Sequence, residues 1–131
     1  MSSLNYDRFK VLHSETIMFC QIIEGDLKWI YDFMHKGDPA ETRSKIANYT
    51  LVQIVNKLKE LDNSDTKPCI SASDYNFLSQ MTEKRSYWCY QCYRDFLYED
   101  SWLFSKDYEK VCNKLQKDHD RLDIVKIKLK R

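Results

Sequence analysis

The sequence predicts an all-α protein, an up-down bundle of four to five helices, folded as one domain over residues 1–131. Turn-forming residues are scarce, because the chain has two Gly and two Pro, whereas an all-β domain would need many more turns. Apolar residues recur at every third or fourth position over long stretches, which is the spacing of an amphipathic helix. Aromatic residues make up 14% of the chain and can bury a large core, so disorder is not expected.

The N-terminal third of the chain predicts one long helix over residues 4–35. Gly25 lies inside it and marks a kink or a site of close packing. Gly37 is placed to cap the C-terminal end of this helix. Pro39 is placed at the first position of the next helix, where its missing N–H costs little.

The second helix is expected over residues 40–62. Thr50 and Gln53 have the spacing of a capping box, so the pattern also allows a helix that begins near residue 50, and 40–49 is left open as helix or loop. The polar segment 61–68, which ends in a proline, predicts a loop.

Two further helices are expected in the second half. Ser71 or Ser73 can cap the start of a third helix, which should continue to about Tyr98. A fourth helix should begin near residue 102. The tail 124–131 alternates apolar and basic residues, which is a strand-like period, but it also continues the helical stripe, and we expect helix.

Composition limits the function classes. The net charge is +1, so the chain as a whole produces no strong field that attracts nucleic acid. The five cysteines are an odd number and no signal peptide precedes them, which favours reduced thiols in the cytoplasm. No apolar run approaches the roughly 18 residues of a membrane span, so no membrane partner is expected.

Cys89 and Cys92 form a Cys-x-x-Cys pair, which could be half of a metal site. A structural zinc site needs four ligands, and no second pair stands elsewhere in the sequence. Free cysteines three residues apart on a helix also pack as small apolar residues. We therefore expect core packing, with no metal and no cofactor.

An arginine interrupts the apolar face of the third helix. On this face lie, at helical spacing, Met81, Arg85, Trp88, Cys92 and Phe96. A guanidinium in such surroundings must be paired or must bind an anion. Arg85 therefore either pairs with an acidic residue of another helix, such as Glu24 or Asp26, or faces a binding site.

The segment that begins at Arg85-Ser86 and ends at Tyr90 resembles the motif region of the HEPN superfamily, small all-helical domains that include many metal-independent ribonucleases. The family pattern is Arg, a polar residue, several further residues and then His. Arg85 and Ser86 match its first half, whereas Tyr90 stands where the His is expected. The resemblance implies an RNA-binding or RNA-cleaving protein of the toxin or defence type. It also implies a homodimer with its cleft at the interface, and a cognate antitoxin is a candidate protein partner.

Catalysis is expected to be impaired because RNA cleavage by the 2′-hydroxyl needs a general base and a general acid. Histidine serves because its pKa is about 6.5, whereas tyrosine, at about 10, is a poor base at pH 7. Arg85 can still stabilise phosphate charge. His119, on the apolar stripe of the fourth helix, could supply the missing base if the bundle places it beside Arg85; otherwise it is a satisfied, half-buried histidine.

An aromatic and basic surface is expected along the third helix. Tyr87, Tyr93 and Arg94, with Tyr90 and Tyr98, could stack on the bases of single-stranded RNA. The same residue types are enriched at dimer interfaces. Residues 106–131 carry nine basic and five acidic side chains, which also allows a modest RNA-binding surface.

Two functions follow from these patterns. The first is a HEPN-like RNA-binding or RNA-cleaving protein, impaired as an endoribonuclease. The second is a non-enzymatic helical module that binds a protein partner. An Arg85 that opens into a cleft favours the first function, and an Arg85 enclosed in an ion pair favours the second.

Overall fold

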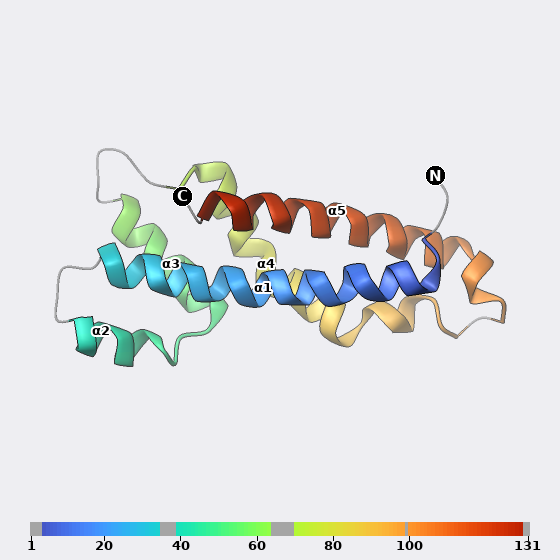
Figure 1. Ribbon diagram of the computed structural model, residues 1–131, viewed down its shortest axis with the longest axis horizontal. Coiled ribbons are helices and arrows are strands. Elements are labelled where there is room, and N and C mark those ends of the chain that lie inside the picture. The colour runs from blue at the N-terminus through green and yellow to red at the C-terminus, as the bar shows by residue number, and fades with distance from the viewer. Residues whose placement is uncertain (1–3, 35–38, 64–69, 99, 130–131) are drawn as a thin grey trace.

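The computed structural model describes residues 4–34, 39–63, 70–98 and 100–129, and it shows an all-α bundle (Figure 1). Its α-helices are α1 (Tyr6–Met34), α2 (Pro39–Ile46), α3 (Leu51–Asn63), α4 (Ala72–Tyr90) and α5 (Lys106–Leu129). Two short 3₁₀ helices, η1 (Cys92–Asp95) and η2 (Trp102–Phe104), lie between α4 and α5. The predicted fold class is confirmed, and helix α5 includes the tail as far as Leu129.

Helices α1 and α5 pack along each other in the same direction, and α4 runs the opposite way (Figure 1). The Tyr108 hydroxyl donates a hydrogen bond of 2.7 Å to the Leu4 carbonyl. Further along both helices, His119 Nε2 lies 3.3 Å from a carboxylate oxygen of Glu15. Residue numbers therefore rise together along α1 and α5, which fixes their parallel orientation.

The core consists of two clusters of buried apolar side chains, and α1 contributes to both. One cluster joins the second half of α1 to α3 and to the first half of α4, with Ile23, Leu58 and Met81 fully buried. The other joins the start of α1 to the end of α4 and the start of α5, around Phe9 and Trp88. Burial of apolar surface contributes roughly 25 cal/mol per Å², so these clusters supply the main driving force for packing.

The expected second helix over 40–62 is divided in two, and the capping-box alternative is confirmed. The Thr50 hydroxyl accepts a hydrogen bond from the Gln53 N–H at 3.3 Å, and the Gln53 side chain accepts one from the Thr50 N–H at 2.8 Å. These reciprocal bonds satisfy two N–H groups at the start of α3. Residues 40–46 are helical as well, and Pro39 begins α2 as expected. Helix α3 continues to Asn63, so the predicted loop starts later; positions 64–68 lie outside the described residues, as does Gly37.

Gly25 does not mark close packing, which corrects one expectation. Helix α1 continues through it without interruption. A Cβ atom built at Gly25 would meet no other atom within 4 Å, so this position faces open space.

Candidate functional site

Helix α4 carries the residues that resemble the HEPN motif, and it ends at Tyr90 rather than near Tyr98. Its start is capped as expected, because the Ser71 hydroxyl accepts a hydrogen bond from the Asp74 N–H at 3.1 Å. The helix ends where the Trp88 carbonyl takes other hydrogen-bond partners. His13 Nε2 lies 2.6 Å from this carbonyl oxygen, and the Cys92 thiol donates to it at 3.4 Å.

These contacts occupy the carbonyl that the Cys92 N–H would bond in a continuing helix. The chain turns into η1 instead. Cys92 remains buried in the core, but Cys89 is exposed, so the expected core packing of this pair is wrong for Cys89. Because α4 stops at Tyr90, the two cysteines do not share one helical face.

Arg85 forms an ion pair between α4 and α1. Its guanidinium donates to a carboxylate oxygen of Glu24 at 3.3 Å, and the two side chains are 30% and 26% exposed. Of the two acidic partners proposed from the sequence, Glu24 is the one observed. Cys20 lies nearby, and burial raises the pKa of its thiol to about 11, although the positive charge of Arg85 acts in the opposite direction.

Ser86 and Tyr90 face outward. They are four residues apart and share one side of α4, and the Tyr90 side chain is 78% exposed. Each helical residue advances about 100° around the axis, so Tyr90 points roughly 140° away from Arg85. Within one copy of the chain, these two side chains do not converge on a common point.

His119 has partners of its own. Its Nε2 and Nδ1 atoms lie 3.3 Å from Glu15 and 3.1 Å from Asp120, and its ring contacts Phe19. Glu15 and Glu24, the partners of His119 and Arg85, are nine residues apart on α1. This separation corresponds to about 13 Å along the helix axis. No hydrogen bond or ion pair joins His119 to Arg85 among the described residues, and the alternative of a satisfied, half-buried histidine holds.

Tyr87 and Tyr93 are half-buried, so their rings are less open than expected for stacking on bases. The Tyr87 hydroxyl donates to Asp95, and the Lys114 ammonium lies 3.6 Å from the centre of the Tyr87 ring. Burial, with the hydrogen bond to Asp95, raises the pKa of Tyr87 above its ordinary value. Tyr93 packs against the rings of Phe9 and His13. Arg94, on η1, is exposed.

Basic residues of α5 are also engaged within the chain. Arg121 and Lys128 lie 3.0 Å and 3.3 Å from the two carboxylate oxygens of Asp74, at the start of α4. Lys126 pairs with Asp123 and lies over the ring of Phe19. These contacts reduce the positive charge that the helix presents to a polyanion.

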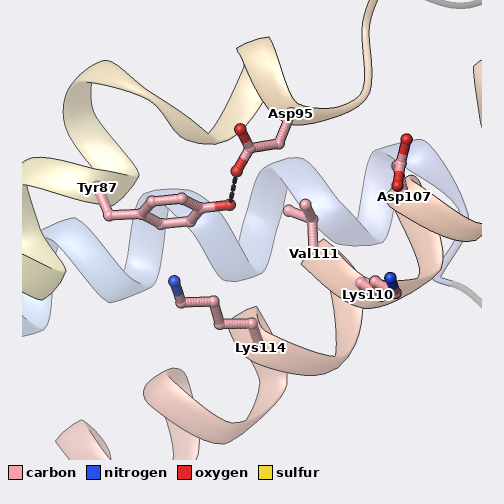
Figure 2. Close-up of a pocket in the computed structure, with 6 residues that line it drawn as sticks. All are labelled: Tyr87, Asp95, Asp107, Lys110, Val111 and Lys114. Carbon is pink, nitrogen blue, oxygen red and sulfur yellow. Dashed lines mark hydrogen bonds between the residues drawn. The ribbon is translucent and has the colours of Figure 1, made fainter.

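A pocket of about 400 Å³ lies beside the motif helix, between α4, η1 and α5 (Figure 2). Its lining contains two lysines, two aspartates, a tyrosine and a valine: Tyr87, Asp95, Asp107, Lys110, Val111 and Lys114. Opposite charges are balanced in this lining. Its chemistry suits polar contacts, and its lining lacks a histidine that could act as a base near neutral pH.

The sequence interpretation missed a buried polar group next to the motif. Asp118 accepts hydrogen bonds from the Trp88 indole N–H at 2.9 Å and from the Lys84 ammonium at 3.0 Å. A signal was present, because Asp118 occupies an apolar position of the α5 stripe between Leu115 and Leu122. A buried carboxylate must be paired, and this one fastens α5 to α4.

Comparisons with protein-family models, with curated proteins and with solved structures found no match. Within the described ranges, no three His, Cys, Asp or Glu side chains gather where they could hold a metal ion. In the same ranges, no helix is both long and apolar enough to cross a membrane.

Proposed function

We propose that this chain is a non-enzymatic helical-bundle module that binds a protein partner. The observation that carries the proposal is the ion pair of Arg85 with Glu24, which occupies the guanidinium that would otherwise be available to phosphate. Tyr90 and His119 support it further, because neither side chain converges on Arg85. Of the residues that resemble a catalytic motif, Arg85 thus serves the packing of α4 on α1, whereas Ser86 and Tyr90 face outward.

The surface proposed for the partner lies on residues 90–98 and 100–104, from the end of α4 to η2. Tyr90, Tyr98 and Phe104 are 78%, 84% and 90% exposed, and Leu97 and Leu103 are also exposed. Exposed aromatic side chains mark protein interfaces, where Tyr and Phe are enriched. We call these five residues the terminal aromatic surface.

The test compares two exposed sites that carry the same chemical change. Tyr98→Glu/Phe104→Glu places charge on the terminal aromatic surface, and Val52→Glu places it on α3, where Val52 is also exposed. A partner that co-purifies with the tagged wild-type protein should be lost with the double variant and kept with Val52→Glu. Its affinity is then measured by calorimetry with both proteins purified. Equal affinity for wild type and the double variant would contradict the proposed surface.

A second candidate function is a HEPN-like RNA-binding protein of the toxin or defence type, with impaired catalysis and an antitoxin as partner. The all-α bundle and the position of Arg85 and Ser86 in its second half support this candidate. The Arg85–Glu24 contact also supports it, because 3.3 Å is longer than the roughly 2.7–2.9 Å of a strong charge-assisted hydrogen bond. A phosphate could compete with Glu24 for the guanidinium.

Tyr90→His tests the second candidate. It restores a group that titrates near pH 7, and general acid–base catalysis contributes roughly 10²–10⁴-fold. Cleavage of single-stranded RNA, or slower growth of the host cells, is expected, and Arg85→Ala should abolish both. Because residue 90 points away from Arg85 in one copy, the two groups would have to meet across a dimer.

The matched control is Ser86→His, one turn earlier on the same outward face. It adds a histidine at another exposed position of α4 without the motif spacing. If Tyr90→His folds normally but neither cuts RNA nor harms cells, the HEPN interpretation loses its main support. If the unmodified protein cleaves RNA in an Arg85-dependent way, the non-enzymatic proposal is wrong.

A further inference from the structure

Helix α1 has a second apolar stripe, on the side that faces away from the core. Val11, Met18, Trp29 and Phe33 are large apolar residues with exposed side chains. At about 100° per residue, they fall with Gly25 within an arc of roughly 80°. The buried residues of α1 are centred about 130° away on the same helix. We call Val11, Met18, Gly25, Trp29 and Phe33 the outer α1 stripe.

The stripe is long and mostly apolar. From Val11 to Phe33 it extends about 33 Å along the axis, at 1.5 Å per residue. Trp29 and Phe33 are 65% and 85% exposed. An apolar patch of a few hundred Å² on a soluble protein often marks an interaction site. In Figure 1, α1 passes in front of α4.

We propose that the outer α1 stripe binds the same stripe of a second copy, with the two α1 helices antiparallel about a two-fold axis. The inference is independent of the proposed function, which uses the terminal aromatic surface. It also differs from the dimer expected from the sequence, which used the tyrosines of the expected third helix. Two of those, Tyr87 and Tyr93, are half-buried within the chain.

Shape complementarity favours a second copy as the occupant. Gly25 leaves a notch in the stripe, because a Cβ there would meet no atom within 4 Å. A two-fold axis between residues 21 and 22 places Met18 of each copy against Gly25 of the other. A two-fold interface requires such reciprocal contacts, since residue i meets residue j and j meets i. The protruding methionine and the notch lie seven residues apart on the same stripe.

Charge favours the antiparallel direction. Lys10 and Asp32 flank the stripe near its opposite ends. The same two-fold axis places Lys10 opposite residue 33 of the second copy, which is next to Asp32 of that copy. Lys10 otherwise pairs with Asp7 at 3.3 Å, and both side chains are largely exposed, so this surface pair is weak and can be exchanged. In a parallel dimer Lys10 and Asp32 of the second copy would lie about 33 Å apart along the axis and could not pair.

The apolar area of the stripe approaches what a standard dimer interface buries. A large aromatic side chain can bury about 150–250 Å², so Trp29 and Phe33 contribute roughly 300 Å² per copy at their observed exposure. Val11 and Met18 raise the apolar area to roughly 450 Å². A standard interface buries about 800 Å² per partner, of which roughly 65% is apolar in homodimers.

Sedimentation of the full chain tests the proposal. The wild-type protein at tens of micromolar should have twice the 15.8 kDa mass of one chain. Trp29→Glu/Phe33→Glu should convert it to a monomer with unchanged helical content, because both side chains are exposed in the single chain. Loss of a central aromatic contact weakens an interface by on the order of thirty-fold. The matched control, Tyr98→Glu/Phe104→Glu, removes the terminal aromatic surface and should stay dimeric.

Cross-linking tests the register in a Cys69→Ser/Cys89→Ser background. Met18→Cys/Gly25→Cys should be joined across the dimer by a short bifunctional thiol reagent. Met18→Cys alone should not, because its two thiols would lie about 10 Å apart along the axis. A monomeric wild type, which would leave the stripe to another kind of partner, overturns the proposal. So does a dimer that survives Trp29→Glu/Phe33→Glu, or one that is lost with both double variants.

Discussion

Removal of the Asp118 carboxylate should destabilise the bundle more than any change at its exposed acidic neighbours. In Asp118→Ala the buried Trp88 indole N–H loses its acceptor, which costs about 1–3 kcal/mol. The Lys84 ammonium also loses its partner at 3.0 Å, but it is 25% exposed, so solvent screening limits this loss to about 1 kcal/mol. We expect the free energy of unfolding to fall by about 3 kcal/mol.

Thermal unfolding followed by circular dichroism measures this effect. With an unfolding entropy of about 2.1 cal/mol/K per residue, a loss of 3 kcal/mol in a chain of 131 residues lowers Tm by about 10 °C. Asp118→Asn keeps an oxygen for the Trp88 N–H while removing the charge, so its loss should be about half as large. Fluorescence of Trp88 should change in Asp118→Ala as its hydrogen bond is removed.

The matched control is Asp120→Ala, two residues along the same helix. Asp120 is exposed and accepts from Gln116, so its removal should change the free energy of unfolding by less than about 0.5 kcal/mol. If Asp118→Ala and Asp120→Ala have the same Tm, the Asp118–Trp88 hydrogen bond does not add to the free energy of unfolding.

Three further outcomes are expected. Thr50→Ala removes half of the capping box with Gln53 and should lower the free energy of unfolding by about 1 kcal/mol, measured by urea denaturation. In a Cys69→Ser background, a thiol reagent at pH 8 should modify exposed Cys89 rapidly and the buried cysteines only on unfolding, so Cys89→Ser should remove the fast phase. Burial raises the pKa of Cys20 from 9.0 to about 11. The unfolded chain therefore loses this proton first, and stability should fall between pH 9 and 11, with a smaller slope in Cys20→Ala; an unchanged slope would contradict this assignment.

The sequence by itself determined the fold class and most of the helices. Apolar residues at helical spacing predicted α1, α3, α4 and α5, because a stripe of this period can be buried only as a helix face. The sequence also predicted hydrogen bonds between residues that are close together in the chain. The Thr50–Gln53 capping box and the Ser71 cap depend on residues three positions apart, and both are present in the structure.

The candidate site could not be predicted to the same degree. Arg85 was recognised as an anomaly on an apolar face, and Glu24 was one of two proposed partners. The choice between them depends on how far α1 is displaced along α4. The period of apolar residues in either helix gives no information about this displacement. The pairing of His119 with Glu15 has the same origin, because it depends on how far α5 is displaced along α1.

Only the tertiary structure decided where α4 ends and which surfaces remain exposed. The helical pattern continues to Phe96, but His13 approaches from α1 and competes for the Trp88 carbonyl, so α4 ends at Tyr90. The exposure of the outer α1 stripe was also decided by the tertiary structure. Trp29 and Phe33 lie off the apolar stripe that predicted α1, and the helical period does not tell whether another helix covers that side; within the described residues no helix buries them.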